Sequence, residues 1–345
     1  MRRRDPTCPD PCKQPADHPA ACPPPGQKAV RYVQVMLHIF ARLGGALAVL
    51  GLLIPTTTSF PTNPEEYVVT EKSGTSQAEV YDNAGEWIAT FTYGAQTVAL
   101  AGPQRTFTEP GTTAAVVSSI HVRLLPEPFT GAVDQHWLRS AVSDTSPDLL
   151  DMAMQYVSGA PDIRDEAGLR IAGDAGYGAS SADGTLQEGA DFNDYLGIRW
   201  DYAGKSDAPE ANELKALDCS GYIRMLFGYR GGMGMTLSPA PGLLPRRSFQ
   251  MLENAPGTLV HKSTGQLKTF DGIQPGDLVF FDAEADTAGQ IDHVGMFLGA
   301  DTAGKNRFIS SRKSSNGPTL GDAAARSILD GTGYYAKALR GVRRL

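Results

Sequence analysis

The sequence has little cysteine outside its first residues, no long apolar run and no excess of basic charge. Cys219 is the only one of the four cysteines that lies beyond residue 22. Because a lone cysteine cannot form an intrachain disulfide, Cys219 is either a buried apolar side chain or a reactive thiol. The formal net charge is −7, and the chain beyond residue 42 holds 24 basic and 35 acidic residues. This balance argues against nucleic acid as a partner.

The longest uncharged apolar run, residues 43–54, has 12 residues and is shorter than the roughly 20 residues that span a bilayer. Arg42 precedes the run and Met36 offers an alternative start, which is typical of a signal peptide. We expect residues 1–60 to be a proline-rich leader with a signal peptide, or with an uncleaved membrane anchor if the apolar residues from Val30 onward also insert. The protein is then secreted or held at the cell surface, and it meets a membrane only through this segment.

The opening also lacks the pattern of a metal site. Cys8, Cys12 and Cys22 have prolines between them and no histidine at ligand spacing, which is a weak zinc pattern. We therefore predict no metal and no other cofactor.

Residues 61–184 lack a motif that carries chemistry. Residues 61–130 predict a small β-rich module, because short runs of β-branched and aromatic residues alternate with glycine, proline and asparagine. Residues 131–184 predict a helical segment, with Leu149 and Tyr156 on one face, followed by a linker rich in glycine and serine.

A helix start is predicted at Cys219. Asp218 and Cys219 stand directly before an apolar helical pattern that ends at a glycine pair, residues 231–232. Asp218 is thus the expected N-cap, and Cys219 lies in the first turn. Because a helix N-terminus presents free N–H groups and positive potential, we expect it to lower the pKa of the thiol and to stabilise an oxyanion.

A histidine in a predicted antiparallel meander completes this pattern. Residues 277–282, 291–298 and 307–311 predict three strands joined by short polar loops that contain glycine. His293 lies in the middle strand and is the only well-placed base among the six histidines. A cysteine at a helix start, followed by a histidine in such a meander, is the arrangement that a Cys/His nucleophilic pair needs.

The segments ALDCSGYIRMLF, IQPGDLVFFD, DHVGMFLG and RFISS resemble, in this order and at similar spacing, the motif series of the NlpC family of papain-like cell-wall endopeptidases. The resemblance covers residues 185–345 and implies an α+β fold whose nucleophile lies at a helix N-terminus packed on an antiparallel sheet. It implies hydrolysis of the bond after D-glutamate in peptidoglycan stem peptides, through a thioester and without a metal. Cys219 is then the nucleophile, His293 the base, the Cys219 backbone N–H an oxyanion donor and Ser220 a substrate contact.

The third catalytic position departs from the family pattern. Ser310 stands where a polar residue, commonly histidine, is expected directly after the Phe-Ile pair of the third strand. A serine can hydrogen-bond the imidazole but does not stabilise an imidazolium as a carboxylate does. A slip of one residue in register would present Ser311 instead.

The aromatic segment before the cysteine departs as well. Trp200 stands at the position of the family's tyrosine near the oxyanion site, and Tyr202 stands at the following aromatic position. We expect Trp200, Tyr202 and Asp218 to contribute to the substrate site.

A third departure lies in the segment LPRRSFQM. Arg247 replaces the aspartate found in family members that act on free stem-peptide amines, whereas Ser248 is retained as a predicted substrate contact. This replacement favours stem peptides that are still attached to glycan. Arg246 and Arg247 also fit a solvated helix start.

Two alternative functions use the same residues. A non-hydrolytic wall-binding or scaffolding protein on a decayed hydrolase fold fits the altered third position, although the intact Cys219 and His293 argue against it. Another thiol amidase or an acyltransferase would use the same pair.

Overall fold

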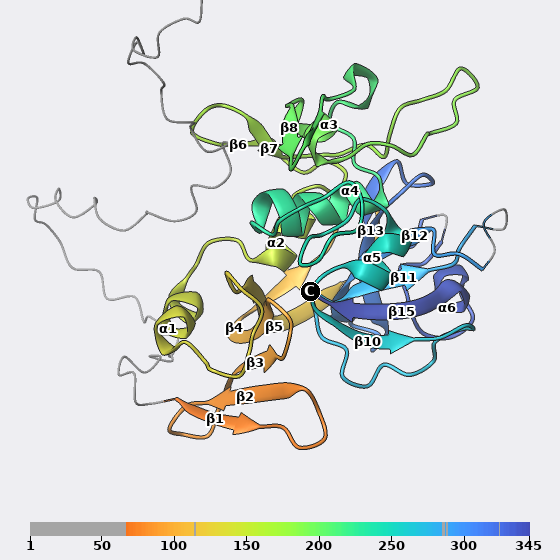
Figure 1. Cartoon of the computed structure of the whole chain (residues 1–345). Helices are drawn as coiled ribbons and strands as arrows, with labels where there is room; N and C mark the ends of the chain where they lie inside the picture. Colours follow the sequence, from red (N-terminus) through yellow and green to blue (C-terminus); the bar gives the residue numbers. More distant parts are fainter. Residues whose placement is uncertain (1–66, 114, 285–286, 288, 324) are drawn as a thin grey trace, which may run out of the picture. The chain divides into compact units, whose positions relative to one another are not determined.

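The computed structural model describes residues 67–345, except 114, 285–286, 288 and 324 (Figure 1). The expected leader and its signal peptide or anchor, residues 1–60, lie outside the described residues. Within the described part of the chain, no helix is long and apolar enough to cross a membrane.

An antiparallel meander of five strands, in the order β1-β2-β3-β4-β5, opens the described chain. The strands are β1 (Val68–Glu71), β2 (Gln77–Tyr81), β3 (Trp87–Thr92), β4 (Thr97–Phe107) and β5 (Val116–Leu124), and the helix α1 (Gln135–Ser143) follows them. Phe91 and Leu100 of the sheet pack against Leu138 and Ala141 of α1. This sheet lies within the residues for which the sequence predicted a β-rich module.

A six-stranded antiparallel sheet, in the order β10-β15-β11-β12-β13-β14, carries the candidate site. The strands are β10 (Thr258–Lys262), β11 (Leu278–Phe281), β12 (His293–Ala300), β13 (Asn306–Arg312), β14 (Gly317–Thr319) and β15 (Leu339–Arg344). The adjacent strands β11, β12 and β13 confirm the predicted meander. Their β-branched and aromatic side chains are nearly all buried, because helices and the first sheet cover them.

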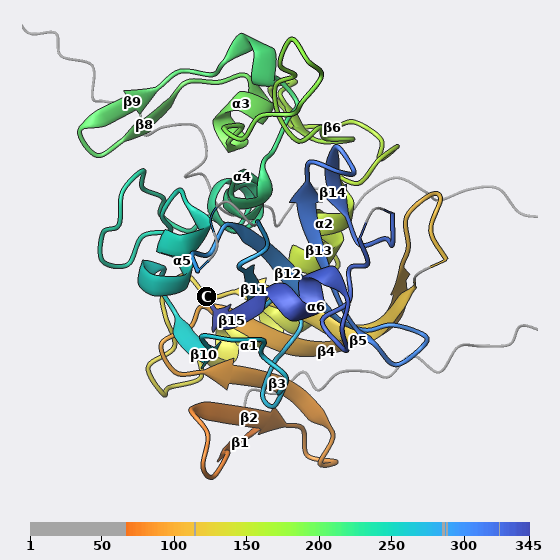
Figure 2. The ribbon, with the colours of Figure 1, turned by 90° about the vertical axis from the view of Figure 1, so that its right-hand side faces the viewer.

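Short helices cover this second sheet. They are α4 (Cys219–Ile223), α5 (Ser248–Asn254) and α6 (Tyr334–Ala338), whereas α2 (Leu149–Met154) packs against β5 of the first sheet. The helix α4 packs against β12 and β13 (Figure 2). It continues into a π-helical segment, η3 (Arg224–Arg230), which ends at Gly231 as the glycine pair predicted. Antiparallel sheets with few helices make an α+β fold, and this confirms the predicted class.

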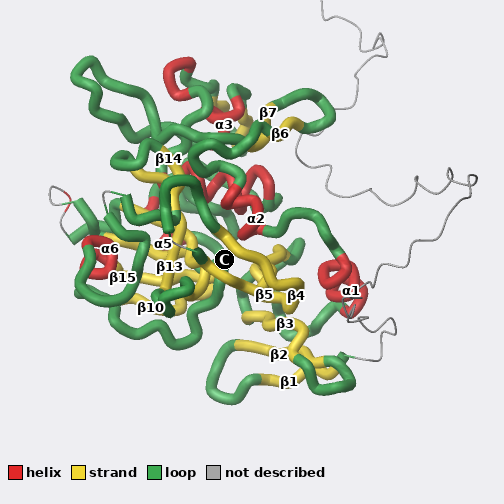
Figure 3. The backbone as a smooth tube through the Cα atoms, turned by 180° about the vertical axis from the view of Figure 1, so that it is seen from behind, coloured by secondary structure: helices red, strands yellow, loops and turns green. Residues whose placement is uncertain are grey.

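Between α2 and α4 the chain is mostly loop (Figure 3). The short elements there are β6 (Ile163–Arg164), β7 (Arg170–Ala172), α3 (Phe192–Leu196), β8 (Trp200–Tyr202), β9 (Lys205–Asp207) and η2 (Ala211–Glu213). One isolated bridge pairs Gly176 with Ala216, and the N–H of Leu217 donates to the carbonyl oxygen of Gly176 at 2.9 Å. This pairing brings residue 177 next to the start of α4.

The two sheets share a hydrophobic core. Phe107 and Val122 of the first sheet pack in the same cluster as Leu278 and Met296 of the second. A Cβ on Gly276 would lie 2.9 Å from a methyl group of Val122. The turn before β11 therefore sits directly on β5, and the first sheet supports the strands of the site.

Candidate active site

Cys219 is the first residue of α4 and is buried. Asp218 is its N-cap and accepts a hydrogen bond of 2.7 Å from the N–H of Gly221, which confirms the predicted cap. A Cβ on Gly221 would lie 2.3 Å from the carbonyl oxygen of Ala190. Glycine thus lets the first turn of α4 approach the neighbouring backbone, and this contact fixes the place of the thiol.

The electrostatics at Cys219 differ from the sequence expectation. Burial, and after it the negative charge of Asp218, raise the pKa of the Cys219 thiol. The expected lowering of this pKa by the helix N-terminus is outweighed here by burial and by the charge of Asp218. Cys219 therefore rests as a neutral thiol.

His293 is the first residue of β12, the strand that packs against α4. The Cys219 sulfur donates to the carbonyl oxygen of Asp292 at 3.9 Å, directly beside His293. The Nε2 atom of His293 lies 3.0 Å from Oγ of Ser310. Ser311 points away and donates to a backbone carbonyl oxygen near Asp218. The structure thus places Ser310, and not Ser311, against the imidazole.

Gly295 allows β13 to come close enough for this hydrogen bond. A Cβ on Gly295 would lie 2.7 Å from the carbonyl oxygen of Ile309 and 3.1 Å from Cβ of Ser310. Any larger residue would push β13 and its serine away from β12.

Aromatic rings and one cation enclose His293. The ring of Tyr335 lies 5.4 Å and that of Phe281 5.8 Å from the imidazole, centroid to centroid. Behind Ser310, Nε of Arg312 donates to Oγ of the serine at 3.0 Å. Burial, and after it the charge of Arg312, lower the pKa of His293 to about 3. The imidazole is therefore neutral.

Two cavities open beside these residues. A cavity of about 330 Å³ lies on the side of His293, and one of about 140 Å³ lies on the side of Cys219. Glu188, Glu284 and Asp292 line both. The larger is also lined by Tyr177, Arg312, Lys313, Tyr334 and Tyr335, and the smaller by Asp218, Ser220, Arg247, Ser248 and Phe249. A substrate chain that crosses from one cavity to the other passes the thiol and the imidazole.

The sequence model of the NlpC/P60 family matches residues 197–341. This segment is an NlpC/P60 domain. The match begins 12 residues after residue 185, where the motif resemblance placed the start of the hydrolase part. No curated protein matches the sequence.

Three solved structures of this family are similar to the chain. A lipoprotein-like NLP/P60 protein from Staphylococcus aureus subsp. aureus Mu50 shares 18% identity over 62% of this chain and 50% of its own, with a TM-score of 0.26. NlpC1 from Trichomonas vaginalis shares 12% identity over 78% of this chain and 77% of its own, with a TM-score of 0.29. An NlpC/P60 protein from Bacillus cereus ATCC 10987 shares 15% identity over 81% of this chain and 78% of its own, with a TM-score of 0.26. The match spans half the length of the Staphylococcus protein.

Asp218 and Ser220 of the NlpC/P60 domain are held by a buried arginine. Arg246 lies 2.7 Å from Oδ2 of Asp218 and 3.3 Å from Oδ2 of Asp191, and it donates to Oγ of Ser220 at 2.6 Å. The interpretation of Arg246 as part of a solvated helix start is wrong, since only 8% of its surface is exposed. Asp218 and Ser220 nevertheless line the cavity beside Cys219.

The start of α5 forms another wall of that cavity. Ser248 is buried, and its hydroxyl donates to the carbonyl oxygen of Ile291 at 3.4 Å. Arg247 is exposed and lines the cavity. The two residues singled out in the LPRRSFQM segment thus lie beside the thiol.

Trp200 and Tyr202 lie elsewhere in the NlpC/P60 domain. The ring of Trp200 packs edge-on against Phe192, with centroids 5.1 Å apart. The hydroxyl of Tyr202 accepts a hydrogen bond from Arg224, which is fully buried. Neither residue lines either of the two cavities. The structure therefore does not bring the predicted aromatic pair to Cys219 and His293.

Tyr177 is a site residue that the sequence reasoning missed. It lines the larger cavity, and its hydroxyl donates to Oε1 of Glu188 at 3.2 Å. Burial, and in addition the negative charges of Asp218 and Glu188, raise the pKa of Tyr177. Its only sequence signal is the run AGYGA, which lies in the linker predicted before residue 185. The tyrosine comes close to α4 through the distant pairing of Gly176 with Ala216.

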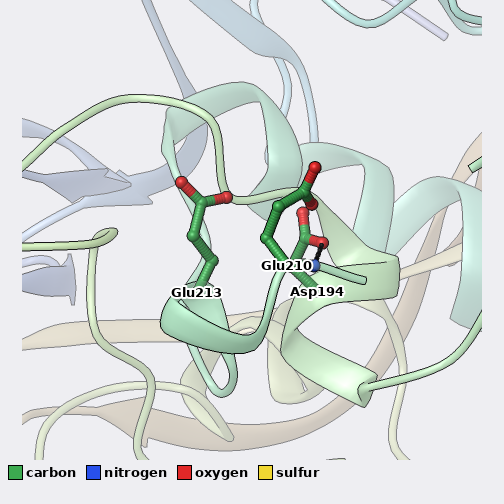
Figure 4. Close-up of side chains that lie close together, drawn as sticks. All are labelled: Asp194, Glu210 and Glu213. Carbon is green, nitrogen blue, oxygen red and sulfur yellow. Dashed lines mark hydrogen bonds between the residues drawn. The ribbon is translucent and has the colours of Figure 1, made fainter. Parts of the chain in front are cut away.

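Three acidic side chains gather on α3 and η2. Asp194, Glu210 and Glu213 each offer a carboxylate oxygen, and these oxygens lie within 4.8 Å of one another (Figure 4). The Glu210 N–H donates to Oδ1 of Asp194 at 2.9 Å. Burial, and after it the hydrogen bond with Glu210, raise the pKa of Asp194 to about 7. The cluster could hold a metal ion, and its protons can equally be shared among the three carboxyl groups.

Proposed function

We propose that the protein is an exported peptidoglycan hydrolase, a D,L-endopeptidase that cleaves stem peptides after D-glutamate. NlpC/P60 proteins are generally cell-wall peptidases, and residues 197–341 match that family. The proposal rests on one arrangement: Cys219 at the start of α4 lies against the strand that begins with His293, and Ser310 supports the imidazole.

The residues of the site fit nucleophilic catalysis through a thioester. His293 accepts the thiol proton while the Cys219 sulfur attacks the peptide carbonyl carbon, and the backbone N–H of Cys219 donates to the oxygen that becomes negative. The imidazolium then gives its proton to the leaving amine, and an acyl-thioester remains on the sulfur. Water, deprotonated by His293, hydrolyses the thioester and restores the free thiol.

Export is the part of the proposal that concerns the chain's first residues. The apolar run 43–54 behind Arg42 supports a signal peptide or anchor. Expression of the full chain, followed by intact-mass measurement of the protein in the medium and in the membrane fraction, tests it. Recovery of the intact chain only from the cytosol would refute export.

Hydrolysis is tested with purified peptidoglycan and with synthetic stem peptides, using mass spectrometry to locate the cleaved bond. We expect new ends at D-glutamate with the wild-type chain and none with Cys219→Ala. Equal product yields from both proteins would remove Cys219 as the nucleophile. Wall binding that survives Cys219→Ala, with cleavage by neither protein, would favour the wall-binding alternative. Cleavage at another amide would point to the amidase alternative.

A further inference from the structure

Arg312 and Arg343 are the two buried arginines of the described chain that form no ion pair, and Arg312 is the more deeply buried of the two. Arg224, Arg246, Arg307 and Arg344 are all buried, and each forms an ion pair with an aspartate. Arg312, which is 2% exposed, pairs with none of the carboxylates in the described chain. A buried cation without a counter-ion is costly, so its neighbours indicate its role.

The surroundings of Arg312 hold its guanidinium in one place. Nε donates to Oγ of Ser310 at 3.0 Å and Nη1 to the carbonyl oxygen of Ala325 at 2.8 Å, while Nη2 donates to Ser327. The guanidinium carbon lies 4.5 Å from the ring centroid of Tyr335, a favourable cation–π distance. Tyr335 also lies against His293. Arg312 thus contacts both a hydrogen-bond partner and a ring neighbour of the imidazole.

The hydroxyl of Ser310 links this cation to His293. A guanidinium only donates, so Ser310 Oγ accepts from Arg312 and forms its second bond, of 3.0 Å, with Nε2 of the imidazole. If His293 were protonated, the same oxygen would have to accept from two cations. The neutral imidazole avoids this repulsion, since its Nε2 can accept from the hydroxyl or donate to it without a charge.

The other charged groups around His293 have partners of their own. The groups that face it are Asp292 on its own side, Asp218 and Cys219 at α4, Tyr177 and Glu188 before α3, Glu284 after β11, Lys313 after β13, and Tyr334 and Tyr335 on α6. Lys313 lies 3.0 Å from Glu188 and 3.3 Å from Glu284. Asp218 pairs with Arg246. The carboxylate of Asp292 accepts from two backbone N–H groups and a threonine hydroxyl. Among the described residues, Arg312 is therefore the cation near His293 that has no ion-pair partner.

We propose that Arg312 is a positioning residue of the active site, which holds Ser310 against His293 and keeps the imidazole in its neutral, proton-accepting form. This inference deepens the proposed function and rests on it, because a neutral imidazole matters to catalysis only if His293 is the base. A base that stays neutral in acid remains able to take the thiol proton there. We expect a hydrolase whose activity persists well below pH 6.

The test measures the titration of His293 by imidazole NMR in the full chain, with the signal assigned by its loss in His293→Gln. We expect the wild-type signal to show neutral imidazole down to at least pH 5. In Arg312→Gln, which can still donate to Ser310 but carries no charge, the midpoint should rise by about one to two pH units. The acid limb of kcat/KM for stem-peptide hydrolysis should move by the same amount, while Arg312→Lys should stay near the wild type.

A second buried arginine on the same strand supplies the matched control. Arg307→Gln breaks the pairs with Asp301 and Asp322 and should leave the midpoint of His293 unchanged. The proposal is overturned if wild-type His293 titrates near its ordinary pKa of about 6.5, a result that needs no variant to fold. It is also overturned if Arg312→Gln titrates as the wild type does, or if Arg307→Gln shifts the midpoint equally. The NMR result stands even if no peptide is hydrolysed, so failure of the proposed function is seen separately.

Discussion

Replacement of Arg246 by methionine removes the cation that pairs with Asp218, directly before the nucleophile, while keeping a long side chain there. Arg246 joins Asp218, the N-cap of α4, to Asp191, the N-cap of α3. Burial alone would raise the pKa of Asp218, but Arg246 and the N–H of Gly221 hold it below its ordinary value. In Arg246→Met the carboxylate of Asp218 is left buried and without a counter-ion.

The size of the effect follows from which partners are left. Removing one partner of a buried ion pair costs about 3–5 kcal/mol. Asp191 keeps Arg224 at 3.0 Å, and Asp218 keeps its bond to Gly221 at 2.7 Å. We therefore take the lower end and expect Arg246→Met to lose about 3 kcal/mol in the free energy of unfolding at pH 7. Arg247, which is exposed, offers a neighbouring control, and Arg247→Met should change stability by less than about 0.5 kcal/mol.

Urea denaturation of both variants and the wild type, followed by tryptophan fluorescence, measures this difference. A lowered pKa of Asp218 means that its stabilising contribution is present above its unfolded pKa and is lost as pH falls through the folded value. In Arg246→Met burial raises the pKa of the uncompensated carboxylate, so it takes up a proton as the pH falls and the deficit against the wild type should shrink in acid. The double variant Asp218→Asn with Arg246→Met should be more stable than Arg246→Met alone. Equal stability of Arg246→Met and Arg247→Met at pH 7 would refute this account of the buried pair.

Three further changes test other parts of the structure. Gly295→Ala places a methyl group 3.1 Å from Cβ of Ser310; we expect a loss of about 1–3 kcal/mol in denaturation and a lower kcat in peptide hydrolysis. Arg247→Asp should raise kcat/KM for stem peptides with a free amine relative to their acetylated forms, by up to about fivefold, because an exposed ion pair contributes about 0.2–1 kcal/mol. The raised pKa of Asp194, about 7, means that its contribution to stability is full below its unfolded pKa and is lost as pH rises through 7. Glu210→Gln removes the acidic neighbour, so the fall in Tm between pH 5 and pH 7.5 should become smaller.

Each of these three variants has a control variant that isolates the cause of its expected effect. Gly265, around which no atom lies within 4 Å of an added Cβ, should accept alanine without effect, and an equal loss there would contradict the close approach at Gly295. Arg247→Lys should leave the preference between free and acetylated amines unchanged. Glu127→Gln removes an exposed acid far along the chain, and a Tm profile identical to that of Glu210→Gln would rule out the carboxyl cluster as the source.

The nucleophile and its helix were predictable because their signals are local. Asp218, an apolar helical pattern and a terminating glycine pair lie within 15 residues of one another, and capping acts over that distance. The strands β11 to β13 were predictable for the same reason, since alternation of β-branched and aromatic residues is read within a strand. Ser310 came from the family resemblance of the RFISS segment, and only the structure decides between it and Ser311.

The basic residues of the core could not be placed from the sequence. The strand β15 has the sequence LRGVRR, which looks like a solvated end, yet Arg344 is buried and lies 2.8 Å from Asp277. Arg246 and Arg312 are buried as well. Burial of an arginine depends on partners supplied by distant elements, and no periodicity within the residue's own segment reports them. Tyr177 shows the same limit, because its approach to α4 depends on a bridge between Gly176 and Ala216.

The two buried arginines lie beside the two catalytic residues and bear on their protonation at rest. Burial and the charge of Asp218, which Arg246 offsets only in part, favour the proton on the sulfur of Cys219. Arg312, one hydroxyl away from the imidazole, opposes a positive charge on His293. Both pKa shifts disfavour a thiolate–imidazolium pair at rest and favour transfer of the proton from the sulfur as attack on the carbonyl begins. Catalysis in the proposed hydrolase then depends on a substrate whose carbonyl is already in place, which ties the activity of the thiol to occupation of the two cavities.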